Sequence, residues 1–241
     1  MPQIRTPRRR AALLFTTVLL AGPSLPLAAQ TSHPLWQQTR QHLARLGGLV
    51  AGQVEYRISQ QGAGRRAQYR AVEQLAGWDG SQPQRRWVAS ADSPMQGLAE
   101  VRPPADFNPA DHPERVLLDI DTVEPAGVEL RGAVPAQVFD IQGHLEAQES
   151  LAGSQQARRV GFRGQVWVEQ DGGAPLRLDY QLDGLPFTQE FRYQVDFAPD
   201  VRNHRQVPVQ ARLTVTTRLP LVGSSTVQRQ LQFSDWQERP Q

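Results

Sequence analysis

The chain has 241 residues, no cysteine, and 26 basic against 24 acidic residues, for a formal net charge of +2. The lack of cysteine excludes a disulfide scaffold, a thiol nucleophile and an anchor attached through an acylated cysteine. The near balance of charge gives no reason to expect a nucleic-acid partner, and the length suits a single all-β domain.

The first segment has the composition of a secretory signal peptide. Four arginines between residues 5 and 10 precede the apolar run AALLFTTVLLAG, and LPLAA leads to Gln30. The apolar run is too short to span a membrane as a helix. We therefore expect residues 1–29 to be removed on export by the general or the twin-arginine route. Removing the four arginines leaves 22 basic and 24 acidic residues, so the mature chain has a formal net charge of −2. We expect the mature chain in the periplasm, with peripheral membrane contact at most.

An amphipathic helix is predicted near the start of the mature chain, over residues 32–48. Trp36 and Leu43 share its apolar face, Pro34 suits the first turn, and Gly47 ends it. Strands follow at once, because apolar and polar residues alternate from residue 53 onward. Three strands are predicted here, over residues 53–59, 65–75 and 85–90.

The alternation breaks down between about residues 92 and 127, where six prolines make a continuous sheet improbable. Within this segment, residues 108–120 are predicted to form a short helix. We interpret the segment as an irregular insertion, and either a covering element over the sheet or an ordinary surface connection fits its composition.

Strands return after residue 127 and continue to the end of the chain in a series of predicted antiparallel hairpins. EFRYQVDFAP, residues 190–199, shows the pattern best: Phe191 and Tyr193 point to one face, whereas Arg192 and Gln194 point to the other. The other predicted strands cover residues 134–141, 157–170, 175–182, 207–218 and 227–233.

A mainly β (α+β) fold follows: a curled antiparallel sheet or incomplete barrel, with a few short helices as a lid. Sequential long hairpins favour a strongly curled sheet over a sandwich, and few helices are available to cover its apolar face. We expect an apolar cavity, with a filled β core as the alternative. The predicted lining residues are Trp36, Tyr56, Tyr69, Phe162, Leu178, Tyr180, Phe191, Tyr193 and Leu213.

No catalytic signature supports an enzyme, since the chain has no nucleophile elbow, zinc-protease helix, phosphate loop or dinucleotide fingerprint. We expect no catalytic residue, no metal and no cofactor. The weak exceptions are carboxylates and a histidine in the irregular segment, namely Asp106, Asp111, His112, Glu114, Asp119 and Asp121.

Three short stretches, GWDG, GQVWVEQDGGAPLRLDYQL and FSDWQ, together with the amphipathic N-terminal helix, resemble the periplasmic lipoprotein-carrier superfamily. This superfamily includes the LolA-like carriers and envelope-stress sensors. The resemblance implies one LolA-like domain over residues 30–241, folded as an incomplete barrel with a helical lid over an apolar cavity. It further implies a lipid or a lipidated protein as ligand, and a carrier or chaperone role. The alternative is a non-catalytic sensor or interaction module that binds an envelope protein.

Overall fold

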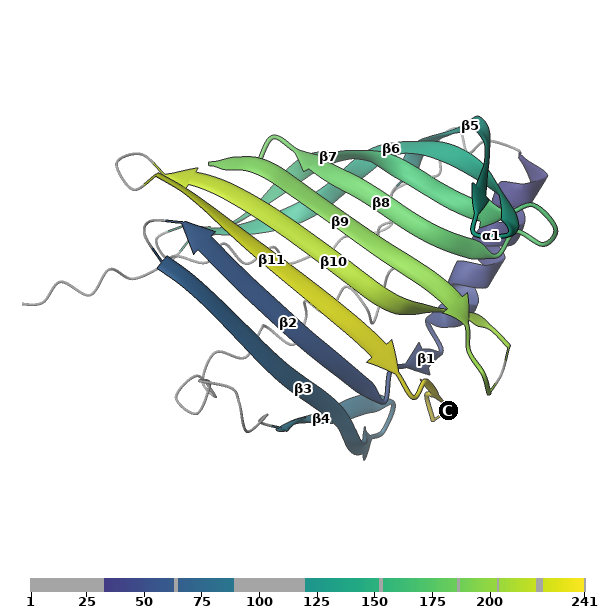
Figure 1. Ribbon diagram of the computed structural model, residues 1–241, viewed down its shortest axis with the longest axis horizontal. Coiled ribbons are helices and arrows are strands. Elements are labelled where there is room, and N and C mark those ends of the chain that lie inside the picture. The colour runs from purple at the N-terminus through teal and green to yellow at the C-terminus, as the bar shows by residue number, and fades with distance from the viewer. Residues whose placement is uncertain are drawn as a thin grey trace, which may run out of the picture.

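The computed structural model describes residues 33–62, 65–88, 120–151, 154–185, 187–202, 204–219 and 223–240. For residues 65–67, 69, 145–151, 154–158 and 219, the description covers the backbone alone. Within these ranges the chain forms one helix and twelve strands. The prediction of a mainly β fold built on one antiparallel sheet is confirmed, and the sheet is not closed into a barrel (Figure 1).

Ten strands make up the main sheet, and two very short strands form a separate ladder. The main sheet consists of β2 (Gln53–Gly62), β3 (Arg65–Asp79), β4 (Gln82–Val88), β5 (Ile120–Arg131), β6 (Val134–Leu151), β7 (Ser154–Glu169), β8 (Pro175–Asp183), β9 (Thr188–Pro199), β10 (Gln206–Leu219) and β11 (Gly223–Ser234). The small ladder pairs β1 (Leu49–Val50) with β12 (Gln237–Glu238).

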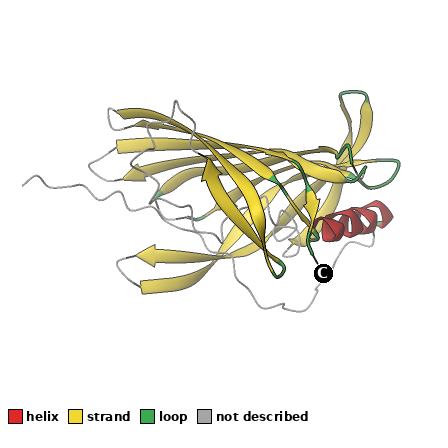
Figure 2. Cartoon of the chain, turned by 90° about the horizontal axis from the view of Figure 1, so that it is seen from below, coloured by secondary structure: helices red, strands yellow, loops and turns green. Residues whose placement is uncertain are grey.

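The strand order across the sheet is β4-β3-β2-β11-β10-β9-β8-β7-β6-β5, and every neighbouring pair is antiparallel. Two runs of hairpins, β2 to β4 and β5 to β11, are joined through the pairing of β2 with β11. β4 and β5 therefore form the two edges of the described sheet. The sheet curls between these edges and presents a concave face (Figures 1 and 2).

Side-chain alternation decides which residues line the concave face. Phe191, Tyr193, Val195 and Phe197 of β9 are all buried there, as the sequence predicted. The alternating residues Glu190 and Arg192 lie exposed on the convex face.

Gly164 of β7 allows a close approach between β7 and β8. A Cβ atom added there would lie 2.6 Å from Tyr180 Cα and would also collide with the carbonyl oxygen of Asp179. Glycine within a strand commonly marks such a bend or close contact. Because Gly164 pairs with Tyr180, the missing side chain makes room for strongly curled strands at this position.

The helix α1 (Pro34–Leu46) packs against one end of the concave face (Figure 2). Trp36, Thr39, Leu43 and Leu46 form its buried side. The Thr39 hydroxyl donates to the Leu35 carbonyl at 2.9 Å, so this buried polar group is satisfied within the helix. The predicted helix start and apolar face are therefore confirmed.

The start of β5 differs from the sequence interpretation. The segment expected to be irregular up to residue 127 becomes a strand at Ile120, so residues 120–127 belong to β5. Pro125 fits because β5 is an edge strand and the register shifts between Pro125 and Gly127. Apart from Ile120, the helix predicted over residues 108–120 lies outside the described residues.

Leu176 also departs from its predicted face. Period-two alternation along residues 175–182 would place Leu176 on the same face as Leu178 and Tyr180, but it packs with Ala136, Val138 and Trp167 in a small second cluster. The register shift between Trp167 and Val168 interrupts the alternation at the start of β8, which explains the change.

Candidate ligand-binding face

The concave face holds nearly all the predicted lining residues in one hydrophobic cluster. Eight of the nine lie in it and are at most 9% exposed: Trp36, Tyr56, Phe162, Leu178, Tyr180, Phe191, Tyr193 and Leu213. The side chain of the ninth, Tyr69, lies outside the described residues, although its backbone pairs with Ile58 in the ladder between β2 and β3. The cluster thus gathers predicted lining residues from α1 and from five strands, namely β2, β7, β8, β9 and β10.

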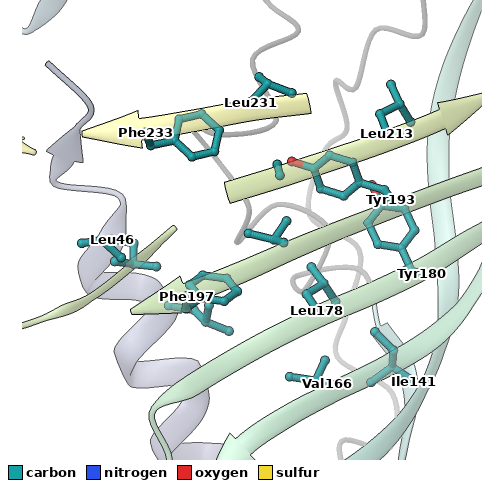
Figure 3. Close-up of a cluster of buried hydrophobic side chains, with 14 of the residues drawn as sticks. Leu46, Ile141, Val166, Leu178, Tyr180, Tyr193, Phe197, Leu213, Leu231 and Phe233 are labelled. Atoms are coloured by element: carbon teal, nitrogen blue, oxygen red, sulfur yellow. The ribbon is translucent and has the colours of Figure 1, made fainter. Parts of the chain in front are cut away.

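A row of paired residues crosses the middle of this face. Tyr180 of β8 pairs with Tyr193 of β9, which pairs with Leu213 of β10, and Leu213 pairs with Arg229 of β11. Arg229 in turn pairs with Ile58 of β2. The rings of Tyr180 and Tyr193 lie side by side with their centroids 5.3 Å apart (Figure 3). We call these five residues the central row.

The hydroxyl of Tyr193 is buried in the central row. It has no hydrogen-bond partner among the residues that the structure describes, although tyrosine hydroxyls usually find a partner when buried. Burial, together with the nearby Tyr180, raises the pKa of Tyr193 above its ordinary value. Tyr193 therefore places a polar atom that no described residue satisfies within a largely apolar cluster.

Arg229 is the residue of this face that the sequence interpretation missed. It lies between Val227 and Leu231 in VQRQLQF, so strict alternation along β11 puts it on the apolar side. Its side chain is half-buried, and burial lowers the pKa of its guanidinium. No hydrogen bond or ion pair to Arg229 occurs within the described part of the chain.

A polar group lies on the flank of the concave face formed by β2, β3 and β4. The Tyr56 hydroxyl donates to Glu73 at 3.0 Å, and Arg85 lies 3.8 Å from the same carboxylate. The ring of Trp87 lies 5.2 Å from that of Tyr56. Glu73 is the one carboxylate among the described inward-facing positions of these strands, and it is already engaged by Tyr56 and Arg85.

The helix is short compared with the sheet that it contacts. Its 13 residues correspond to a length of about 20 Å, whereas the 16 residues of β7 extend over about 50 Å. The side chain of His42 lies 3.0 Å from the carbonyl oxygen of Gly172, at the turn between β7 and β8. α1 therefore covers one end of the concave face, and the central row lies farther along the strands.

The convex face carries an ion-pair network around Asp179, one of the two buried polar residues of the described chain. Arg192 donates to both carboxylate oxygens at 3.0 and 2.7 Å, and Gln194 donates at 2.7 Å. Arg177 lies 3.4 Å from Asp179. Burial alone would raise the pKa of Asp179, but these hydrogen bonds and positive charges lower it below its usual value.

This network extends toward β5 through Arg177. Arg177 lies 3.3 Å from Asp196, and both Arg177 and Arg131 stack on Trp167, at 5.7 and 5.1 Å. The indole of Trp167 donates to Glu129 at 2.8 Å. Because its acids and bases are paired within the sheet, we interpret this network as structural support for β5, β8 and β9 and not as a binding site.

A shallow depression of about 400 Å³ lies elsewhere, over β2, β10 and β11. None of the predicted lining residues contributes to it, and five of its seven residues are polar. The seven are Gln53, Glu55, Val209, Gln210, Gln232, Phe233 and Ser234. Glu55 is already engaged there by Arg57 and Arg70 at 2.8 and 3.0 Å. The charged residue of the depression is therefore already paired, and we do not assign a ligand to it.

The residues considered for catalysis or metal binding do not form a site in the described chain. Within it, no three histidine, aspartate or glutamate side chains gather as metal ligands. Asp121 instead contacts His144 at 2.6 Å. The remaining candidates lie outside the described residues: Asp106, Asp111, His112, Glu114 and Asp119. In the described ranges, no helix is both long and apolar enough to cross a bilayer.

Comparison with known proteins gives a similarity in structure but none in sequence. No family model matches it, and no curated protein sequence does. Among solved structures it is similar to a DUF1329 family protein from Desulfovibrio piger, with a TM-score of 0.35 and 13% identity. That match covers 84% of this chain and 92% of the other.

Proposed function

We propose that this chain binds an apolar ligand, a lipid or an acyl chain, on its concave face and catalyses no reaction of that ligand. One observation carries the proposal: the hydrophobic cluster continues across the sheet to the central row, whereas α1 contacts only one end. Within the described ranges, the one helix lies over only an end of this curled apolar face, and a concave apolar lining is suited to such a ligand.

The setting of this activity is proposed to be the periplasm, because residues 1–29 have the composition of a signal peptide. The resemblance to lipoprotein carriers extends the proposal to lipidated proteins as cargo. A carrier or chaperone of this kind contacts membranes only peripherally, in keeping with its proposed ligand.

Direct titration tests the proposal. The mature protein, starting at Gln30, is titrated with cis-parinaric acid, and the increase in fluorescence is expected to saturate at one equivalent and to be reversed by oleate. Native mass spectrometry of protein taken from the periplasm is expected to show a retained lipid. If no probe binds saturably, the concave face is a filled core, and the alternative function as a sensor or interaction module takes its place.

A further inference from the structure

We propose that Arg229 is the anchoring residue for the anionic head group of an amphipathic ligand whose apolar tail lies along the neighbouring cluster. This inference rests on the proposed function and adds the class of ligand: a chain with a carboxylate or phosphate at one end. It is carried by the position of Arg229 in the central row and by the absence of a negative partner among the described residues.

The register shows why the guanidinium faces the same side as the apolar cluster. Arg229 pairs with Leu213 and with Ile58, so all three side chains point to one face. Leu231 and Phe233 follow at every second position of β11 toward α1 and are both buried. Four residues of strand span about 13 Å, so a row of apolar side chains of that length begins beside the charge.

No described carboxylate forms an ion pair with Arg229. Glu73, the described carboxylate on this face, accepts the Tyr56 hydroxyl and lies near Arg85. Burial lowers the pKa of Arg229, and the nearby Tyr56 offsets this in part. A desolvated cation without a partner is costly, so an anion at this position would recover energy that the unliganded protein lacks.

The arrangement also separates the two ends of a ligand. The side of Arg229 toward α1 is apolar, with Leu231, Phe233 and Phe197 in one cluster. The side toward β3 carries the polar group of Tyr56, Glu73 and Arg85. A head group is expected near Arg229, and a tail is expected along Leu231 and Phe233, which lead toward Leu46 of α1 (Figure 3).

The test compares two probes with the same polyene chain, the anionic cis-parinaric acid and its neutral methyl ester. The wild-type mature protein is expected to bind the acid about tenfold more tightly than the ester, the usual range for a charge-assisted hydrogen bond. Arg229→Met is expected to remove this preference, because it lowers the affinity for the acid and leaves the affinity for the ester unchanged. Arg229→Lys, which keeps the charge, is expected to retain part of the preference.

Arg212→Met is the matched control, because Arg212 is exposed on the opposite face of the adjacent strand β10. It is expected to leave both affinities unchanged. Displacement of cis-parinaric acid by dodecanoate and by dodecyl phosphate, each compared with dodecanol, shows whether the site prefers a carboxylate or a phosphate head group. Stronger competition by either anion supports the assignment, and equal competition by all three contradicts it.

The outcomes separate this inference from the proposed function. If neither probe binds, the proposed function fails. If the wild-type protein binds the ester as tightly as the acid, only the role of Arg229 is wrong, and this result needs no variant. A preference for the acid that survives unchanged in Arg229→Met, with the variant melting at or above the wild-type temperature, also overturns it.

Discussion

Arg192 holds the carboxylate of Asp179 with two hydrogen bonds across the ladder between β8 and β9, at 3.0 and 2.7 Å. Asp179 is buried, whereas the side chain of Arg192 is 44% exposed. The pair therefore couples an exposed cation to a carboxylate that has lost most of its water. Alternation alone would treat Arg192 as an ordinary exposed residue, and its partner gives it a structural role.

Replacing Arg192 by alanine is expected to destabilise the protein by about 1–2 kcal/mol, because the buried carboxylate loses its strongest partner while Gln194 and Arg177 remain. Urea unfolding measures the change. Arg212→Ala is the control, with an expected effect within about 0.5 kcal/mol. Equal losses in the two variants would show that the contact with Asp179 contributes nothing.

Acid is expected to weaken the fold through Asp179. Because its pKa is lower in the folded protein than in the unfolded chain, the unfolded state binds more protons as pH falls below about 4. The contribution of ionised Asp179 to the unfolding free energy is therefore fully present above the pKa of this group in the unfolded chain. It is lost as the pH falls through its pKa in the folded protein. Unfolding free energies measured between pH 2 and 7, a range of about five units, should decline less steeply in Asp179→Asn. Identical profiles would contradict the assignment.

A methyl group at position 164 is expected to be poorly tolerated. In Gly164→Ala the new Cβ would meet Tyr180 Cα at 2.6 Å, and backbone cannot move aside as a flexible side chain can. We expect a loss of about 2 kcal/mol or more in unfolding free energy. Gly161→Ala on the same strand is the matched control, since nothing lies within 4 Å of its added Cβ. A loss as large in the control would show that glycine itself, and not the close approach of β8, matters in β7.

Removing the hydroxyl of Tyr193 is expected to leave the stability of the unliganded protein unchanged or to raise it. The oxygen is buried without a described partner, and an unsatisfied buried polar group costs about 1–3 kcal/mol. Thermal unfolding of Tyr193→Phe tests this expectation. A melting temperature several degrees below that of the wild type would reveal a hydrogen bond to this oxygen.

Truncating Phe191 distinguishes a binding face from a filled core. In a filled core, Phe191→Ala should cost about 3–5 kcal/mol of unfolding free energy. If the side chain contacts a ligand, we expect a smaller loss of stability and a clear loss of affinity for cis-parinaric acid. A large loss of stability with unchanged affinity would support the filled core.

Period-two alternation predicted most of the sheet, because long hairpins leave little freedom about which face is buried. It placed Phe191 and Tyr193 on the buried face correctly, and eight of the nine predicted lining residues, these two among them, lie in one hydrophobic cluster. It failed at Leu176, where a register shift that depends on the neighbouring strand changes the face. Such shifts leave little trace in a single sequence.

Arg229 was not among the predicted lining residues for a different reason. Alternation along β11 places Arg229 with Val227 and Leu231, but arginine is usually exposed, so the sequence alone does not single this residue out. The pairing of β2 with β11 could not be read from the sequence either, because it joins strands from opposite ends of the chain. That pairing places Arg229 beside Ile58 and near Tyr56.

The same pairing has a consequence for the order in which the protein can be made. Tyr56 pairs with Leu231, so β2 gains its second neighbour only after almost the whole chain has been synthesised. Until then, β2, β3 and β4 are a three-stranded sheet with an exposed edge, a form prone to misassociation. Contacts between such distant parts of a sequence also slow folding. A chain truncated before β11 is therefore expected to depend on chaperones and to be degraded, even though most of its strands are present.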